Sequence, residues 1–304
     1  MICEPVIETF GLSKSYGGFE AAKDLTFQVL GPRITGFLGR NGAGKSSTIK
    51  MLLGMIRPTS GTATVLGHRI DDAKQSLEIR RKVAYVGEDK GLYAYMTVEQ
   101  LIWFTRSFYP DWRPEIEKRL LEEYQLPPRR KVKALSKGMR TKLALLLALS
   151  RRPALMILDE PTEGLDPVSI EDLLRTITSI TADGTSVFFS SHQLNEVERI
   201  ADAVLMIDRG KLVLNFAMDE LRENYRRVTV GFDRSAPSID LHLPGIERVR
   251  SDGRQLSVLA SRNSDAIVEW ARRCSATSID TQPVSLREIF LDTVQMGPEA
   301  TSSR

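Results

Sequence analysis

The chain has 304 residues, of which 42 are Lys or Arg and 39 are Asp or Glu, giving a formal charge of +3. This length suggests two domains, or one large domain with an appendage. The nearly balanced charge argues against nucleic acid as the partner. The longest strongly apolar run, residues 143 to 149, falls far short of the roughly 20 residues of a membrane span. Because the chain has two cysteines and no signal-peptide pattern at its N-terminus, we expect a cytoplasmic protein without disulfides.

The first 87 residues alternate short β-rich runs with turns and contain one phosphate-loop pattern. RITGFLG, residues 33 to 39, predicts a buried strand, and SSTIKMLLGMI, residues 46 to 56, predicts a helix. The segment between them fits G-x-x-x-x-G-K-[ST], whose backbone N–H groups form an anion nest at a helix N-terminus. We therefore predict a nucleotide phosphate site in which Lys45 reaches the β- and γ-phosphates and Ser46 binds Mg²⁺. Its residues are Gly39, Arg40, Asn41, Gly42, Ala43, Gly44, Lys45, Ser46 and Ser47.

Residues 91 to 126 have helical periodicity and no strand pattern, so we expect an inserted helical subdomain over about residues 89 to 135. Seven aromatic residues lie between positions 92 and 112. After this segment, helix and strand patterns alternate again. Buried strands between helices indicate an α/β core with a parallel sheet. The patterns are a helix at 142 to 150, a strand at 154 to 160, a helix at 169 to 180 and a strand at 185 to 191.

The composition changes near residue 216, and all 12 basic residues from 222 onward are arginine. Short strand patterns at 227 to 232 and 255 to 260 are mixed with helix patterns at 264 to 274 and 285 to 294. We therefore expect a first domain over residues 1 to 221 and a small α+β extension with a flexible tail over residues 222 to 304. The expected fold class is α/β, a P-loop NTPase core with an N-terminal β-rich part, the helical insertion and this extension.

Two adjacent carboxylates end the apolar strand pattern ALMILDE. In a chain with a phosphate loop, a carboxylate at the C-terminal edge of a strand is suited to coordinate Mg²⁺, and we assign this role to Asp159. Glu160 is placed to polarise the attacking water as a general base. Taken alone, the pair could equally be acidic residues that cap a helix.

The order of these motifs resembles that of the nucleotide-binding subunits of ABC transporters, over roughly residues 4 to 220. LSKGM, residues 135 to 139, stands where the family carries its LSGGQ signature. EGLD matches the family's D-loop, with Asp166 in the aspartate position. SSH places His192 as the switch histidine, and SKSYGG puts Tyr16 where the family stacks an aromatic ring on adenine.

The resemblance implies that the protein binds ATP with Mg²⁺ and that His192 contacts the γ-phosphate. It also implies a homodimer or heterodimer that buries two ATP molecules, each touched in trans by the signature of the other subunit. Alternatives stay open, since Tyr16 could be a core or strand-edge aromatic, His192 a structural histidine, and the signature simply a helix N-terminus capped by Ser136. The residues expected to act in trans are Leu135, Ser136, Lys137, Gly138, Met139 and Asp166.

The chain departs from the family pattern at four positions. Lys137 replaces a glycine and Met139 a glutamine of the signature, and Glu163 replaces the serine of the D-loop. Glu88 occupies the place of the glutamine that names the Q-loop. The resemblance therefore implies that Glu88 is a Mg²⁺ ligand, and the alternative is a solvated loop carboxylate.

We expect an ATPase subunit that drives a separate transmembrane permease and lies on the inner face of the membrane through that partner. GEDKGLYAYMTVEQL and SLREIFLDTV resemble segments of the bacterial ABC-2-type exporter ATPases, which favours export. The aromatic segment 92 to 112 is either the docking groove for the permease or the core of the helical subdomain. A soluble ABC ATPase acting on nucleic acid or the ribosome is the alternative function. The lack of a basic excess argues against it.

Overall fold

The computed structural model describes residues 4 to 237 and 244 to 295. These residues form two compact units that divide between Asn215 and Phe216, six residues before the boundary expected from the sequence. The tail expected to be flexible lies outside the described residues after residue 295.

The first unit begins with an antiparallel sheet in the order β2-β1-β4-β5. Strands β1 and β2 are joined by Gly17 and Gly18, which both have positive φ, as a tight hairpin turn requires. This turn pairs Tyr16 with Phe19. The strands are β1 (Pro5–Tyr16), β2 (Phe19–Leu30), β4 (Ser60–Val65) and β5 (His68–Arg69).

A six-stranded sheet in the order β10-β9-β3-β8-β7-β6 forms the centre of this unit. Strand β3 pairs in parallel with β8 and β9, and β7 pairs in parallel with β6 and β8. Every residue of β3, β7 and β8 is buried, which explains their continuous apolar runs. The strands are β3 (Ile34–Leu38), β6 (Val83–Val86), β7 (Leu155–Asp159), β8 (Ser186–Ser191), β9 (Ala203–Asp208) and β10 (Lys211–Ala217).

Helix α1 (Lys45–Leu52) follows β3 and is shorter than the sequence pattern predicts. The chain leaves the helix because Gly54 adopts a φ of +62°, which a continuing helix cannot accommodate. The other helices of the core are α2 (Ala73–Lys82), α6 (Pro167–Ala182) and α7 (Leu194–Ile200).

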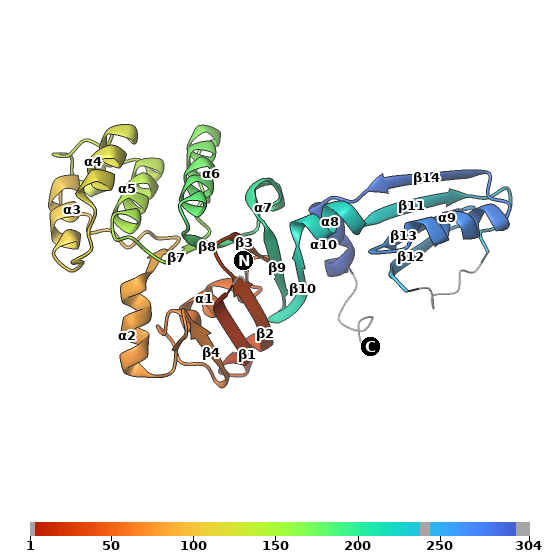
Figure 1. The fold of residues 1–304 in the computed structure, drawn as a ribbon, viewed down its shortest axis with the longest axis horizontal. Helices are drawn as coiled ribbons and strands as arrows, with labels where there is room; N and C mark the ends of the chain where they lie inside the picture. Colours follow the sequence, from red (N-terminus) through yellow and green to blue (C-terminus); the bar gives the residue numbers. More distant parts are fainter. Residues whose placement is uncertain (1–3, 238–243, 296–304) are drawn as a thin grey trace. The chain divides into compact units, whose positions relative to one another are not determined.

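Three α-helices and a short 3₁₀ turn make up the helical insertion, and α3, α4 and α5 lie together in Figure 1. Pro110 and Pro114 bracket the break between the first two helices, and Pro114 is the first residue of α4. A capping box formed by Thr97 and Gln100 starts α3. The elements are α3 (Val98–Arg106), α4 (Pro114–Glu123), the 3₁₀ turn (Val132–Ala134) and α5 (Lys137–Leu149).

The second unit contains an antiparallel sheet in the order β12-β13-β11-β14. One face of the sheet packs with α9 around an apolar cluster that includes Val228, Val258 and Ile267. On α10, the buried carboxylate of Asp292 forms ion pairs with Arg227, Arg248 and Arg250. The elements are α8 (Met218–Asn224), β11 (Arg226–Gly231), β12 (Ile246–Asp252), β13 (Gln255–Ala260), α9 (Ser264–Arg273), β14 (Ser278–Pro283) and α10 (Leu286–Gln295).

Among the described residues, no helix combines the length and the apolar character that a membrane crossing requires.

Candidate nucleotide site

The phosphate loop joins the carboxyl end of the buried strand β3 to the first residue of α1. In an open α/β sheet, this edge is where ligands bind. Gly42 and Gly44 have φ values of +79° and +108°, a region that disfavours any residue with a Cβ. At Gly44 a Cβ would also collide with the carbonyl oxygen of Ala21. Backbone geometry therefore dictates glycine here, and it turns the loop into a concave surface at a helix N-terminus.

A cavity of about 360 Å³ opens over this loop. It brings together most of the predicted phosphate site with three acidic side chains, one from the segment after β6 and two from the turn after β7. Its size and its ring of loop residues fit the polyphosphate of a nucleotide. The lining residues are Phe19, Ala21, Arg40, Asn41, Gly42, Gly44, Lys45, Ser46, Ser47, Glu88, Glu160 and Glu163.

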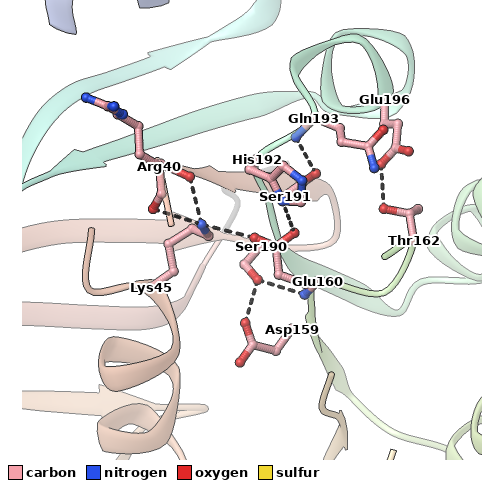
Figure 2. A network of polar contacts seen from close by, with 11 residues as sticks. Arg40, Lys45, Asp159, Glu160, Thr162, Ser190, Ser191, His192, Gln193 and Glu196 are labelled. Atoms are coloured by element: carbon pink, nitrogen blue, oxygen red, sulfur yellow. Dashed lines mark hydrogen bonds and ion pairs between the residues drawn. The ribbon is translucent and has the colours of Figure 1, made fainter. Parts of the chain in front are cut away.

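The Lys45 side chain is almost fully buried and is held by three groups (Figure 2). Its Nζ donates to the carbonyl oxygens of Gly39 at 2.7 Å and Arg40 at 3.3 Å. It also forms an ion pair with Oε1 of Glu160 at 3.0 Å. Glu160 is itself buried, so each charge compensates the other in a site that excludes most water. A phosphate that enters the loop competes with Glu160 for this ammonium group.

Asp159 and Glu160, at the end of β7, are oriented by a buried serine on the neighbouring strand β8. The Ser190 hydroxyl donates to Oδ1 of Asp159 at 2.7 Å and accepts from the Glu160 backbone N–H at 3.0 Å. Glu160 has a φ of +47°, the left-handed region that few residues with a side chain adopt. This turn points two consecutive carboxylates in different directions, and Figure 2 shows Asp159 and Glu160 on either side of Ser190.

His192 and Lys45 contact the two oxygens of the same carboxylate. The His192 Nδ1 lies 2.8 Å from Oε2 of Glu160, while Oε1 faces Lys45. The ring of His192 is partly exposed, with 36% of its side chain accessible. The structure thus joins the phosphate-loop lysine, the candidate base and the candidate switch histidine into one chain of contacts.

A buried pair behind this chain, Thr162 and Glu196, was not predicted from the sequence. The Thr162 hydroxyl donates to Oε2 of Glu196 at 2.7 Å. Burial raises the pKa of Glu196, while the Thr162 hydroxyl opposes that shift. The pair links the loop after β7 to α7, the helix that follows His192. Sequence patterns gave no signal for it, because both residues are ordinary polar residues until the fold brings them together.

Glu88 and Glu163 are neighbours at the rim of the cavity. The pKa of Glu88 is raised, chiefly because the negative charge of Glu163 disfavours a second charge beside it. Close by, burial and the charge of Lys137 lower the pKa of Lys90 to about 8. The structure therefore brings two of the departures from the family pattern, Glu88 and Glu163, to one side of the phosphate site.

The signature residues form the start of α5 and do not line the cavity described above. Ser136 caps the helix, and its hydroxyl accepts from the Met139 N–H at 3.2 Å. Lys137, which replaces a glycine of the family pattern, is the first residue of the helix and does not have a positive φ, so its backbone does not require glycine. Its side chain rests against Gly164, where a Cβ would lie 2.5 Å from Nζ. The signature and the D-loop of one chain are thus a single packed surface.

Asp166 caps α6 in the same way, and its carboxylate accepts from the backbone N–H and the hydroxyl of Ser169 at 3.0 Å and 2.7 Å. These two hydrogen bonds lower the pKa of Asp166. A Cβ on Gly138 would lie 2.9 Å from the Ser169 hydroxyl oxygen, so glycine lets the two helix N-termini approach closely.

Tyr16 and Phe19 are two exposed rings at the same hairpin turn, and only Phe19 borders the cavity. The Lys14 Nζ lies 5.0 Å from the centre of the Tyr16 ring. Because an adenine base lies farther from the phosphate loop than the phosphates do, its stacking partner need not line this cavity. Sequence reasoning missed Phe19, although it directly follows the glycines of SKSYGG.

We expect Tyr16→Ala to weaken ATP binding by about 5- to 150-fold, since base stacking on an aromatic ring contributes roughly 1 to 3 kcal/mol. Phe19→Ala is the matched variant, because it removes the other ring of the same turn. Titration of both variants with ATP measures the effect. A larger loss in Phe19→Ala would transfer the stacking role to Phe19.

The loop, the buried lysine and the ordered carboxylates lie at the carboxyl edge of one parallel sheet, as they do in P-loop NTPases. Comparisons with known proteins indicate which family within this class the chain belongs to. A family model described as ABC transporter matches residues 22 to 163. The bacitracin transport ATP-binding protein BcrA of Bacillus licheniformis is 37% identical over 73% of this chain and 73% of its own.

Other relatives match along almost the whole chain. The ABC transporter ATP-binding protein YtrB of Bacillus subtilis is 29% identical over 94% of this chain and 97% of its own. A solved ATP-binding subunit of an ABC transporter is 32% identical, with a TM-score of 0.65, over 71% of this chain and 92% of that chain. The protein belongs to the family of ABC transporter ATP-binding proteins, and it is an ATPase.

The fold of a further structure, the dimeric cassette MJ0796 with ADP and phosphate bound, is similar at 19% identity and a TM-score of 0.63. It covers 70% of this chain and 98% of that chain.

Proposed function

We propose that this protein is an ATP-hydrolysing subunit that pairs with a second ATP-binding subunit and drives export through a separate membrane protein. The observation that carries the proposal is the buried contact between Lys45 and Glu160 at 3.0 Å. In this contact the Lys45 ammonium, which would hold the β- and γ-phosphates, lies against the Glu160 carboxylate, which would activate water. Two relatives support export rather than import: the bacitracin transport protein BcrA, and the linearmycin resistance ATP-binding protein LnrL of Bacillus subtilis, which is 32% identical over 68% of this chain and 68% of its own.

In this proposal ATP takes the place that Glu160 now holds beside Lys45. The loop from Gly39 to Ser47 would bind the phosphates through its backbone N–H groups and the Lys45 ammonium. Release of Lys45 would free Oε1 of Glu160 to accept a proton from the attacking water. His192, held at 2.8 Å from the other oxygen, would keep that carboxylate in place and contact the γ-phosphate.

Ser46, Asp159 and Glu88 are the proposed Mg²⁺ ligands. Hydroxyl and carboxylate oxygens are suitable donors for this hard cation, which would neutralise charge on the transferred phosphate. Asp159 is buried and oriented by Ser190, and Ser46 and Glu88 line the cavity. The crowding of Glu88 against Glu163 favours a cation at this rim. Activity retained in the presence of a chelator would contradict the assignment.

The signature and the D-loop would act on ATP held by the partner subunit, which is a homologous or identical chain. The helix N-terminus at Ser136, residues 135 to 139 and Asp166 present one packed surface without touching their own phosphate cavity. A helix N-terminus favours anions, and Lys137 adds a positive charge to it.

The helical insertion offers the proposed docking surface for the membrane protein. The rings of Tyr95, Tyr93, Phe104 and Phe108 follow one another with centroid separations of 5.9, 5.5 and 5.1 Å. We call these four residues the aromatic ladder. Tyr95 and Phe108 are 67% and 63% exposed, so the ladder is not a closed core. A groove between α3 and α4 is lined by residues that include Ile102, Trp103 and Leu121, and by none of the four residues of the ladder.

The test starts with the neighbouring gene: where that gene encodes a multi-span membrane protein, the two proteins are co-expressed. We expect ATP hydrolysis by the isolated chain to increase when that partner is present in detergent or vesicles. Alanine at both Tyr93 and Phe108 should abolish the increase while leaving the isolated ATPase unchanged. Phe10→Ala, which removes an exposed ring from β1, is the matched control. A stimulation that survives loss of the ladder would place the docking surface elsewhere.

A further inference from the structure

A basic strip lies beside the aromatic ladder, and the proposed function gives it no role. Arg129, Arg130, Lys131 and Lys133 occupy the connection between α4 and α5, and all four are exposed. No acidic residue occurs from Tyr124 to Leu158. Within the part of the chain that the structure describes, none of the four basic side chains forms an ion pair. The four charges are therefore not neutralised by an ion pair, although an acidic residue, Glu99, lies beside the start of the strip, where its backbone N–H donates to the carbonyl of Pro128 at 3.0 Å.

Backbone hydrogen bonds fix this strip against the segment that begins the ladder. The N–H of Val132 donates to the carbonyl of Met96 at 2.9 Å, and that of Lys133 to Ala94 at 3.0 Å. The N–H of Val98 donates to the carbonyl of Arg130 at 3.1 Å. A bridge between Thr97 and Lys131 completes the antiparallel pairing. Tyr95, 67% exposed, thus lies on a strand-like segment that runs directly beside four cations.

Aromatic rings next to clustered cations are the chemistry of an anionic membrane surface. Tyrosine places its ring at the level of the headgroups, and lysine and arginine are attracted to the surface charge. Nucleic acid fits less well, because in the ladder Tyr93 and Phe104 already pack against other rings and have less free face for a base.

We propose that the basic strip, with Tyr95 beside it, binds anionic phospholipid directly. The inference rests on the proposed function in one respect: a membrane partner docked on the ladder would bring the neighbouring strip close to the headgroups. The strip would then add a second attachment to the membrane, made by the ATPase subunit itself. Lipid composition would influence how the subunit is held.

The experiment uses the full-length protein without any membrane partner. Its binding to vesicles of phosphatidylcholine, and to vesicles of an equal mixture of phosphatidylcholine and phosphatidylglycerol, is measured by co-sedimentation at low and high salt. We expect binding to the anionic vesicles only, weakened by salt because the charges are screened. Glutamine at Arg129, Arg130, Lys131 and Lys133 should lower the partition coefficient at least about tenfold, since each basic residue near an anionic surface contributes severalfold.

The control changes the same amount of charge elsewhere, with glutamine at the exposed residues Arg254, Arg262, Arg272 and Arg273 of the second unit. Equal loss in the two variants would mean that only net charge matters, and it would overturn the proposal. If the native protein does not bind anionic vesicles, the proposal is also overturned, and an acidic protein surface becomes the favoured partner of the strip. ATP hydrolysis by both variants, measured in parallel, should stay at the native rate. An inactive native protein would count against the proposed function instead.

Discussion

Lys45→Ala should lose most of its affinity for ATP. The variant lacks a charge-assisted contact to the phosphates, and hydrogen bonds to charged groups contribute about 1.5 to 3 kcal/mol, or about 10- to 150-fold in affinity. It also leaves the buried Glu160 without the ammonium group 3.0 Å away, so the empty site becomes more negative and repels the polyphosphate. Calorimetric titration with ATP and Mg²⁺ measures the loss.

Lys50→Ala is the matched control for this prediction, because Lys50 is an exposed residue in the last turn of the same helix. It should bind ATP as the native protein does. Native affinity in Lys45→Ala would refute the phosphate-loop assignment. Circular dichroism checks that the variant is folded, since removal of one partner from a buried pair also destabilises the protein.

Glu160→Gln should keep ATP binding and lose hydrolysis by about 10²- to 10⁴-fold, the range that a general base contributes. The amide has nearly the same shape, so the contact with His192 can be retained in part, while the hydrogen bond to Ser190 comes from the backbone N–H and does not depend on this side chain. The ion pair with Lys45 is lost, and the lysine becomes more available to phosphate. ATP that is bound but not cleaved should hold two subunits together. Size-exclusion chromatography with ATP should show a shift from monomer to dimer, and a phosphate-release assay gives the rate.

Glu163→Gln provides the comparison, because this carboxylate also lines the cavity but has no contact with Lys45 or His192 among the described interactions. It should hydrolyse ATP far faster than Glu160→Gln. If Glu160→Gln turns over ATP at the native rate, Glu160 is not the base.

Much of the first unit could be predicted from the sequence, because its signals are local. The buried strands β3, β7 and β8 appear as continuous apolar runs, and α6 has a clear helical period. Helix α1 ended earlier than expected, since the pattern continues through Gly54 while its positive φ does not allow a helix. In the second unit β14 was missed, because SIDTQP is almost entirely exposed and has no apolar alternation.

In the site, too, the local motifs could be predicted from the sequence, whereas the contacts between distant segments could not. The phosphate loop and the carboxylate pair are contiguous motifs whose residue types follow from their chemistry. Ser190, Phe19 and the pair of Thr162 with Glu196 are brought into place by strand pairing and by the folding of distant segments. A serine at the end of a strand carries no sign that it will hold the carboxylate of Asp159, 31 residues away, and the backbone N–H of Glu160, 30 residues away. Only the register between β7 and β8 determines that contact.

At Gly39 and Gly44 another segment of the backbone comes so close that only glycine fits, whereas other positions around the site can hold different amino acids. At Gly39 a Cβ would meet the carbonyl oxygen of Ile207, and at Gly44 that of Ala21, so no other amino acid fits without moving a neighbouring chain segment. The departures at Glu88, Glu163 and Lys137 all lie at exposed or half-buried positions around the site. All four departures from the family pattern, the half-buried Met139 included, thus stand at positions where a different side chain alters the surface around the site, while the loop that would hold the phosphates keeps its shape.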